Sequence, residues 1–292
     1  DEHPEEQGDL DLHVERCGDA LEVQGHGAAA ARALAAAGHE VVVVGRNPER
    51  TRRVADEAGA TAHLADFTDL AQVHTLADEL LTAHPRIDAL VNNAGGLFPE
   101  LAWTHDDLET TFQVDHLAPF LLTHLLLDRL LASEGPAVVT TSSAAHRVSR
   151  LTTADALVLG GRQDERRYVP FRAYADAKLA NLLFTRELHR RYHRAGLASA
   201  AVHPGGVATS FAGTSHDLFG WFYRSPLGQR VLRTPEQGAA DLVRLAGGRP
   251  DVDWPSGQYW ADGRIARVNH RGDDPTLARV LWERSEELLG LA

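Results

Sequence analysis

Residues 87–96 read IDALVNNAGG, a short apolar run that ends in two asparagines and two glycines around one alanine. Such a run is typical of a strand that is buried on both faces of a sheet. Two later runs follow the same pattern, PAVVTTSSAAH at 136–146 and SAAVHPGGVATS at 199–210. The sequence therefore predicts three buried strands that each deliver polar or glycine-rich residues at the carboxyl end.

Helical segments separate these strands, and this alternation predicts the fold class. Strand followed by helix, repeated, is typical of a parallel sheet whose ligands bind beyond the carboxyl ends of the strands. We predict an α/β fold with a single doubly wound, Rossmann-like parallel sheet and helices on both faces. A chain of 292 residues can fill one such domain, which we place at residues 23–292.

Residues 1–22 differ in composition from the rest of the chain. They hold nine acids against one arginine, so they carry −8 of the formal net charge of −12. A solvated tail is the usual interpretation of such a segment. The stretch HVERCGD, residues 13–19, also lacks the apolar character of a first strand. We therefore expect an acidic N-terminal segment that is poorly ordered or atypical.

Composition favours a soluble protein of the cytoplasm. Cys17 is the only cysteine, which excludes an internal disulfide and fits a reducing compartment. The first residues are acidic and predict no signal peptide. The longest apolar stretch, residues 119–131, is interrupted by His124, Asp128 and Arg129, so no membrane span is predicted. The negative net charge argues against nucleic acid as a partner.

Tyr174 and Lys178 lie one helical turn apart in AYADAKLANLLFTREL, residues 173–188. The phenol and the ammonium therefore project from the same face of a predicted helix. A nearby cation favours the phenolate and lowers the pKa of a tyrosine, which prepares it for proton transfer to an alkoxide. The alternative interpretation is a partly buried tyrosine beside a surface lysine.

Several other stretches accompany this pair along the chain. They are NNAG (92–95), a serine pair (142–143), KLANLLF (178–184), HPGG (203–206), TPEQGAADLVRLA (234–246) and LWERSEELLGL (281–291). In this order they resemble the short-chain dehydrogenase/reductase family, and more closely its retinol-dehydrogenase-like branch. The resemblance runs from about Gly25 to the C-terminus. The spacing of 31 residues from Ser143 to Tyr174 is longer than the commonest arrangement in the family, and it resembles the retinol-dehydrogenase-like branch, which carries an insertion here.

The resemblance implies an oxidoreductase that moves hydride between a nicotinamide cofactor and a carbonyl or alcohol. Ser143 would hold the substrate oxygen, and Tyr174 would give or take its proton. Lys178 would lower the pKa of the tyrosine and bind the nicotinamide ribose. Ser142 remains a candidate if the register is off by one residue, and a polar strand end accounts for both serines otherwise. A dehalogenase of the same fold is disfavoured because Lys178 is retained.

Asp115 departs from the family pattern. The stretch FQVDHLAPFLL, residues 112–122, is similar to a family segment with an asparagine at this position, which helps to seat a water next to the lysine. A carboxylate here would pair with Lys178 and weaken its pull on Tyr174. We predict a slower enzyme or a shifted pH optimum, with Asp115 as a member of the catalytic group.

The nucleotide loop is only partly similar to the family motif TGxxxGxG. Gly25 and Gly27 occupy the last two glycine positions before the helix at 28–38, whereas Ala20 and Leu21 stand at the leading threonine and glycine. Glycines let the backbone approach a pyrophosphate at the start of a helix. A leucine at positive φ costs on the order of 1 to 3 kcal/mol. Cofactor affinity is the property at risk, and an ordinary turn with a helix cap is the alternative.

Arg46 favours NADP(H) over NAD(H). Members that prefer NAD carry an acid at the end of the second strand, where this chain has Gly45 followed by Arg46. A guanidinium can hold a 2′-phosphate that a carboxylate would repel. A solvated arginine is the alternative for Arg46. Asp66 is similar to an adenine-contacting acid of the family, and a helix cap would explain it equally well.

The resemblance also implies cofactor contacts at the other strand ends. Gly205 and Thr209 would contact the nicotinamide carboxamide region, although a structural turn with a helix cap competes with this interpretation. The remaining implied cofactor residues are Asn93, Ala94, Gly95 and Pro204. No metal is expected, because His189 and His193 lack acidic or cysteine partners at ligand spacing.

The substrate is predicted only as a class. Residues 211–232 are rich in Phe, Trp and Tyr, which favours a lid over a lipophilic carbonyl or alcohol. The alternative is a binding or scaffold protein that kept the fold and lost turnover, as Leu21 and Asp115 suggest. By family likeness we expect a homodimer or homotetramer through the helices at 105–131 and 172–194, while burial inside the chain explains their apolar faces too.

Overall fold

An eight-stranded sheet forms the centre of the computed structural model, which describes residues 10–14, 25–164, 166–205 and 234–291. The strand order is β3-β2-β1-β4-β5-β6-β7-β8. Every neighbouring pair is parallel except β7 with β8. The strands are β1 (Leu10–Val14), β2 (Glu40–Gly45), β3 (Thr61–Leu64), β4 (Ala89–Asn92), β5 (Ala137–Thr141), β6 (Ala198–His203), β7 (Gln258–Ala261) and β8 (Arg264–Ile265). The predicted α/β, doubly wound parallel sheet is confirmed.

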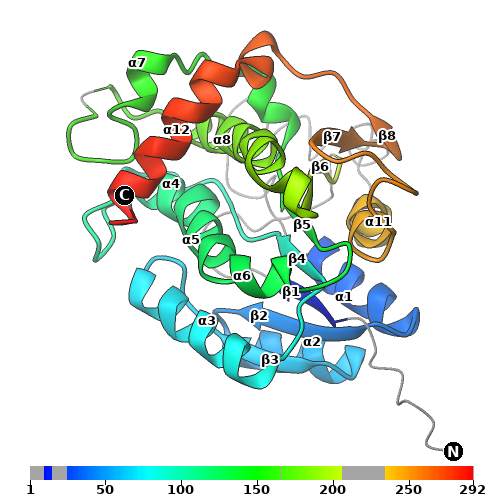
Figure 1. The fold of residues 1–292 in the computed structure, drawn as a ribbon. Helices are drawn as coiled ribbons and strands as arrows, with labels where there is room; N and C mark the ends of the chain where they lie inside the picture. Colours follow the sequence, from blue (N-terminus) through cyan, green and yellow to red (C-terminus); the bar gives the residue numbers. More distant parts are fainter. Residues whose placement is uncertain (1–9, 15–24, 165, 206–233, 292) are drawn as a thin grey trace, which may run out of the picture.

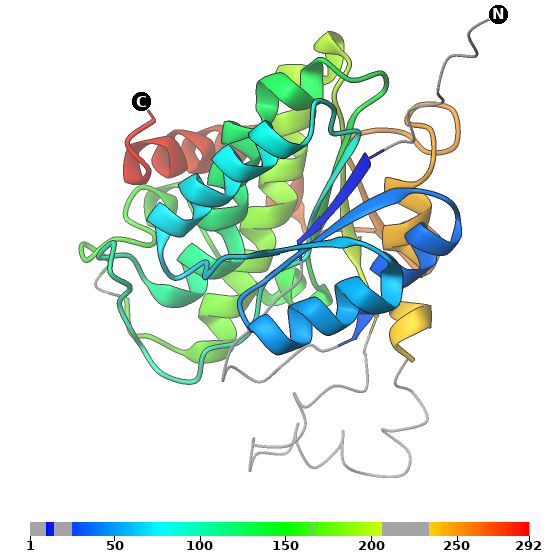
Figure 2. The same ribbon diagram turned by 90° about the horizontal axis from the view of Figure 1, so that it is seen from below.

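Helices cover both faces of this sheet (Figures 1 and 2). One face carries α1, α2 and α11, and the other carries α3, α5 and α8. The α-helices are α1 (His26–Ala36), α2 (Pro48–Ala58), α3 (Leu70–Ala83), α4 (Thr110–Phe112), α5 (Ala118–Leu125), α6 (Leu127–Leu131), α7 (Thr153–Ala156), α8 (Pro170–Tyr192), α11 (Pro235–Ala246) and α12 (Pro275–Leu288). The other helical turns are the π-helix η1 (Gln113–Leu117) and the 3₁₀ turns η2 (Ala144–Val148), η3 (His193–Ala195) and η5 (His270–Asp273).

The strand β2 illustrates why these sequences form a sheet that is buried on both sides. Val41 and Val43 pack into the core beneath α1 and α11, whereas Val42 and Val44 pack into the core beneath α3 and α5. All four valines are at most 3% exposed. Because side chains alternate between the two faces of a strand, a run of four apolar residues fits only a strand covered on both sides.

The order of the strands reverses between β1 and β4, and this point defines the binding edge. From β1 the chain proceeds to β2 and β3 on one side, and it then returns to add β4 to β7 on the other. In open parallel sheets, ligands bind at the carboxyl ends of the strands where the order reverses. The ends of β4 and β5 lie directly beside this point.

The first strand, β1, lies inside the acidic N-terminal segment. The sequence at 13–19 predicted no strand, yet β1 at Leu10–Val14 pairs with both β2 and β4 at the centre of the sheet. Its sequence, LDLHV, alternates apolar and polar residues, so a search for a wholly apolar run overlooks it. The rest of residues 1–22, including Ala20 and Leu21, lies outside the described residues.

The last helix, α12, packs on the outer side of α5 and α8. The Trp282 ring lies 4.7 Å from Phe120 and 5.7 Å from Phe184, measured between ring centroids. All three rings are at most 4% exposed. The apolar faces that sequence analysis considered for a dimer contact are thus partly covered by the chain itself.

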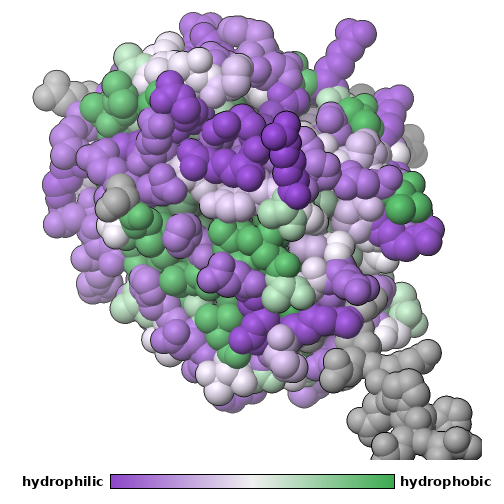
Figure 3. Space-filling view, viewed as in Figure 1, coloured by the Kyte–Doolittle hydropathy of each residue, from purple (hydrophilic) through white to green (hydrophobic). Residues whose placement is uncertain are grey.

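The surface around these helices is mixed. Figure 3 shows hydrophobic residues gathered over α5 and α6, below the mostly hydrophilic outer side of α12. Partly buried apolar residues that pack against the core here include Leu125, Leu127 and Leu131. Within the described ranges, no helix is both long and apolar enough to cross a bilayer.

Candidate active site

The ends of β4, β5 and β6 meet at one edge of the sheet, as the sequence predicted. The Thr141 hydroxyl at the end of β5 donates to Asn93 Oδ1 at the end of β4, at 2.9 Å. The Ser142 amide donates to the carbonyl oxygen of Val202 in β6, at 2.8 Å. Asn93 and Ala94 are buried, and so is Pro204 at the end of β6. Hydrogen bonds therefore fix these strand ends relative to one another.

Tyr174 and Lys178 lie on the same face of α8 and approach this edge. Lys178 Nζ is 5.4 Å from the centroid of the Tyr174 ring, and the two residues are 2% and 8% exposed, lysine first. The alternative of a surface lysine is therefore wrong. A nearby positive charge favours the phenolate form of a tyrosine, whereas burial by itself favours the neutral phenol.

Asp115 reaches the same lysine from the π-helix η1. Its Oδ2 lies 3.3 Å from Lys178 Nζ, and its side chain is fully buried. Its Oδ1 accepts a hydrogen bond from the Gly96 amide, at 2.5 Å. The carboxylate is therefore seated between the lysine and the loop after β4, so the predicted pairing of Asp115 with Lys178 is present.

Gly95 leaves the space that Lys178 occupies. Its φ of 153° is one that side-chain-bearing residues rarely adopt. A Cβ at this position would overlap Lys178 Nζ and lie 2.9 Å from Asp115 Oδ1. The glycine of the NNAG motif thus admits an ion pair beneath the loop, in addition to the cofactor contact that the resemblance implies.

The two serines at the end of β5 have different surroundings. The Ser142 hydroxyl donates to the carbonyl oxygen of Lys178 at 2.7 Å, and the residue is 1% exposed. Ser143 caps the turn η2 by accepting from the Ala145 amide at 3.2 Å, and it is half-buried. That contact leaves the hydroxyl hydrogen of Ser143 for another acceptor. The arrangement favours Ser143 over Ser142 as the residue that meets a substrate.

Gly25 and Gly27 begin helix α1 at the reversal point of the sheet. Gly25 has φ 114°, and a Cβ on it would lie 2.9 Å from Pro235 Cγ at the start of α11. Gly27 is buried in the first turn. The amino end of this helix carries unpaired amide groups and a partial positive charge, which suits a pyrophosphate.

His26, between these two glycines, was not predicted from the sequence. It is 1% exposed, and burial lowers its pKa to about 4, with further contributions from Lys178 and His203. The imidazole is therefore neutral at pH 7. Sequence analysis did not consider that a residue between Gly25 and Gly27 would lie near Lys178.

Arg46 and Asp66 form an ion pair beyond the ends of β2 and β3. Arg46 Nη1 lies 3.3 Å from Asp66 Oδ2, and the side chains are 33% and 27% exposed. Asp66 also accepts from the Thr68 amide at 2.9 Å. It does not cap the following helix, because Asp69 is the N-cap of α3, so that alternative for Asp66 is wrong. The pair is open enough to meet the adenosine end of a dinucleotide.

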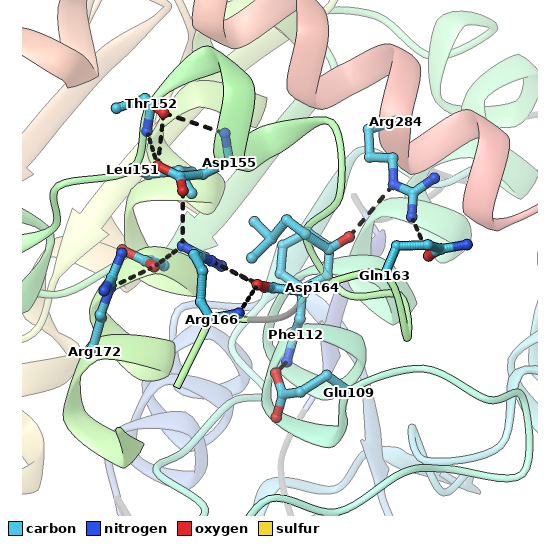
Figure 4. Close-up of polar contacts among 12 residues, drawn as sticks. Glu109, Phe112, Leu151, Thr152, Asp155, Gln163, Asp164, Arg166, Arg172 and Arg284 are labelled. Carbon is cyan, nitrogen blue, oxygen red and sulfur yellow. Dashed lines mark hydrogen bonds and ion pairs between the residues drawn. The ribbon is translucent and has the colours of Figure 1, made fainter. Parts of the chain in front are cut away.

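The insertion between Ser143 and Tyr174 is tied to α8 by one arginine (Figure 4). Arg166 holds Asp164 with two hydrogen bonds of 2.8 and 2.6 Å, and its Nη1 lies 3.2 Å from Asp176 Oδ2. Asp176 is on α8, two residues from both Tyr174 and Lys178. A pocket of about 60 Å³ lies beside this cluster and is bordered by Trp103 and Phe112 among others. The insertion therefore braces the helix that carries the tyrosine and the lysine.

Other expected features fall partly outside the description. Gly205 is described, with φ 87°, but Thr209 and the predicted lid at 211–232 lie outside the described residues. His189 and His193 stack on each other at 4.4 Å. No cluster of three metal-ligating side chains occurs in the part of the chain that the structure describes.

Comparisons with known proteins give a consistent picture. Residues 22–154 match a protein-family model described as short chain dehydrogenase. Retinol dehydrogenase 12 of Mus musculus is 34% identical over 91% of this chain and 84% of its own length. A protein of Streptomyces sp. (strain C5), provisionally named daunorubicin C-13 ketoreductase DnrU, is 38% identical over 91% of this chain and 89% of its own length.

Solved structures agree in fold. An uncharacterised protein from Mycobacterium paratuberculosis superimposes with a TM-score of 0.73 at 31% identity, covering 97% of this chain and 94% of the other. A short-chain dehydrogenase/reductase from Serratia marcescens has a TM-score of 0.64 at 21% identity, covering 88% and 97%, and this likeness shows the fold alone.

Proposed function

Because this chain belongs to the short-chain dehydrogenase/reductase family, in its retinol-dehydrogenase-like branch, we propose that it is an NADP(H)-dependent reductase or dehydrogenase of lipophilic carbonyls or alcohols. Membership makes it an oxidoreductase acting on CH–OH or C=O groups with a nicotinamide cofactor. The observation that carries the finer proposal is the convergence of Tyr174, Lys178 and Asp115 at the ends of β4 and β5.

The residues of the crevice fit a dinucleotide. Gly25 and Gly27 at the start of α1 would receive the pyrophosphate, and Arg46 with Asp66 would receive the adenosine end. Asn93, Ala94 and Gly95 would contact the nicotinamide end of the cofactor, and Lys178 would bind its ribose. Pro204, Gly205 and Thr209 would complete the carboxamide end. Arg46 offers a guanidinium to a 2′-phosphate, and this charge supports NADP(H) over NAD(H).

The mechanism divides the work between hydroxyl groups and charge. Ser143 donates a hydrogen bond to the carbonyl oxygen of the substrate, and Tyr174 donates the proton that converts this oxygen to an alcohol. Lys178 stabilises the phenolate that Tyr174 becomes. A bound nicotinamide would supply the hydride to the carbonyl carbon, or accept it in the reverse direction. Tyr174 regains its proton from solvent, which restores the starting state.

Asp115 makes this chemistry slower than an asparagine would. Its carboxylate lies 3.3 Å from Lys178, so part of the positive charge that should stabilise the phenolate is already neutralised. The same geometry favours one alternative function, a binding or scaffold protein that kept the fold and lost turnover.

The substrate class rests on the relatives and on the sequence of residues 211–232. The relatives are named for retinol and for the C-13 ketone of daunorubicin, and the segment is rich in aromatic residues. Both support a lipophilic carbonyl rather than a small polar one. Cytoplasmic location and assembly as a homodimer or homotetramer stay predictions of the same reasoning.

A two-stage experiment tests the proposal. NADPH and NADH are titrated against the protein while tryptophan fluorescence is followed, and a panel of aldehydes and ketones of increasing chain length is then assayed with the Tyr174→Phe variant as control. We expect tighter binding of NADPH, turnover that rises with chain length, and no turnover in the variant. Binding without turnover, or no binding of either nucleotide, would reject the enzyme and select the scaffold protein.

A further inference from the structure

Asn181 lies one turn after Lys178 on α8 and contacts two other elements of the site. It is 2% exposed. Its Nδ2 donates to the carbonyl oxygen of Asp115 at 2.9 Å and to the carbonyl oxygen of Thr141 at 3.0 Å. One amide group therefore links α8 to the π-helix η1 and to the last residue of β5. These are the elements that carry Lys178, Asp115 and the serine pair.

The orientation of this amide is fixed, and it fixes a histidine in turn. Because Nδ2 donates to two carbonyl groups, Oδ1 must face His116 Nδ1, which lies 3.2 Å away. Burial lowers the pKa of His116 to about 4, so the ring is neutral at pH 7 and carries its hydrogen on Nδ1. His116 Nε2 lies 3.0 Å from the Ser285 hydroxyl of α12, and this hydroxyl also donates to the Leu281 carbonyl oxygen at 2.8 Å.

The π-helix explains why Asp115 needs such a partner. A π-bulge interrupts the regular hydrogen bonds of a helix and often occurs at a functional site. In this bulge the Asp115 carbonyl oxygen accepts from the buried Asn181 amide, and removing one partner of a buried hydrogen bond costs about 1 to 3 kcal/mol. This bond ties the backbone of Asp115 to α8, where the Asp115 carboxylate lies 3.3 Å from Lys178.

We propose that Asn181 is a positioning residue that holds Asp115 against Lys178 and thereby sets how strongly the lysine stabilises the phenolate of Tyr174. His116 acts through Asn181, because its Nδ1 faces the Asn181 Oδ1. The inference rests on the proposed function for its effect on catalysis, but its electrostatic part does not require turnover.

Other ionisable groups near the pair come from several elements. Lys178 interacts electrostatically with His26 of α1 and with His116, His203 of β6 interacts with His26, and Glu109 and Tyr168 interact with Asp115. Tyr259 of β7 interacts with Tyr174. All of these groups remain in place when Asn181 is replaced, so a change in the phenol titration would report the Asp115–Lys178 geometry.

The test is a double-mutant cycle on the cofactor-free protein. The absorbance titration of the Tyr174 phenol is isolated by subtracting the Tyr174→Phe spectrum, for the parent, Asn181→Leu, Asp115→Asn and the double variant. We expect Asp115→Asn to shift the titration to lower pH, and Asn181→Leu to shift it in the same direction by less. In the Asp115→Asn background, Asn181→Leu should produce no further shift.

Thr185→Val is the matched control for folding. Thr185 is fully buried one turn further along α8 and donates to the Asn181 carbonyl oxygen, so its loss removes a hydrogen bond without touching Asp115. We expect it to lower the melting temperature and to leave the titration and the pH profile of kcat unchanged. Equal shifts by Asn181→Leu in both backgrounds, or no shift in either, would overturn the inference.

The kinetic arm separates this inference from the proposed function. If the parent reduces a carbonyl, Asn181→Leu should change kcat and its pH profile more than KM, and it should do so only when Asp115 is present. If the parent reduces none, the proposed function fails while the phenol titration still decides the role of Asn181.

Discussion

Two ion pairs at the binding edge have the same separation and different surroundings. Lys178 Nζ and Asp115 Oδ2 are 3.3 Å apart, as are Arg46 Nη1 and Asp66 Oδ2. The side chains of the first pair are 3% and 0% exposed, and those of the second are 33% and 27% exposed. Distance alone would rank the pairs as equal, so their difference must come from burial.

Burial decides what each pair contributes. An exposed pair adds about 0 to 1 kcal/mol of stability because water and salt screen it. Removing one partner of a buried pair costs about 3 to 5 kcal/mol, since the other charge is left without compensation. The Lys178–Asp115 pair is therefore part of the structure, while Arg46–Asp66 is free to exchange its partner for a ligand.

Replacement of Lys178 should have the largest effect. In Lys178→Met, Asp115 loses its buried partner and Tyr174 loses its cation, so we expect destabilisation by about 3 kcal/mol and a fall in kcat of about 100-fold or more. Urea unfolding and steady-state kinetics measure the two effects. Arg46→Met is the matched change in the exposed pair and should alter stability by less than about 1 kcal/mol. Equal losses in both variants would remove the distinction.

Acid should weaken the buried region next. The folded pKa of His26 lies below its ordinary value of 6.5, at about 4, so the unfolded state binds more protons between these values. Stability is therefore fully present above pH 6.5 and falls as the pH drops toward 4, by up to about 3 kcal/mol for this group. Between pH 7.5 and 4, the urea midpoint of unfolding should fall less steeply with decreasing pH in His26→Leu than in the parent. His105→Leu, at an exposed position, should follow the parent curve.

Arg46 sharpens the comparison from the exposed side. Arg46→Ala should weaken NADPH binding by about 10-fold or more while leaving NADH nearly unchanged, because a guanidinium recognises only the 2′-phosphate. Fluorescence titration of both nucleotides at two salt concentrations measures this. An equal loss for both nucleotides would mean that the arginine acts on the shared part of the cofactor.

Asp115→Asn should give the smallest change in rate, a gain of a few-fold in kcat with the pH profile moved to lower pH, and it should lower stability by about 3 kcal/mol because Lys178 loses its buried partner. An asparagine can still accept the Gly96 amide through its Oδ1, while the neutralising charge beside Lys178 disappears. The pH profiles of parent and variant settle the matter. If the variant is no faster than the parent and its pH profile has not moved, the role assigned to Asp115 is wrong.

The fold could be predicted because its signals are local. Two examples of continuous apolar segments are Val41 to Val44 and the run 87–96. The polar or glycine residues that follow such segments predict the binding edge of the sheet. β1 was not predicted, because its sequence alternates and sits in an acidic segment. A parallel strand at the centre of a sheet is stabilised by the strands on both sides of it. These strands are distant in the sequence, so a short stretch of residues does not reveal the pairing.

The candidate site was predictable to the same extent. Tyr174 and Lys178 were predicted from their helical spacing. Asp115 was predicted from its departure from a family pattern. Asn181 and His116 carry no such signal, because their partners are backbone carbonyl groups and a serine 169 positions away. Contacts of this kind follow from packing, and only the folded chain displays them.

Helix α12 has a consequence for assembly. Because Trp282 lies against Phe120 and Phe184, helix α12 covers the outer side of α5 and α8. A second copy could dock there only by peeling this helix away and wetting three aromatic rings. Self-association, if it occurs, must therefore use a surface that leaves the final helix in its place.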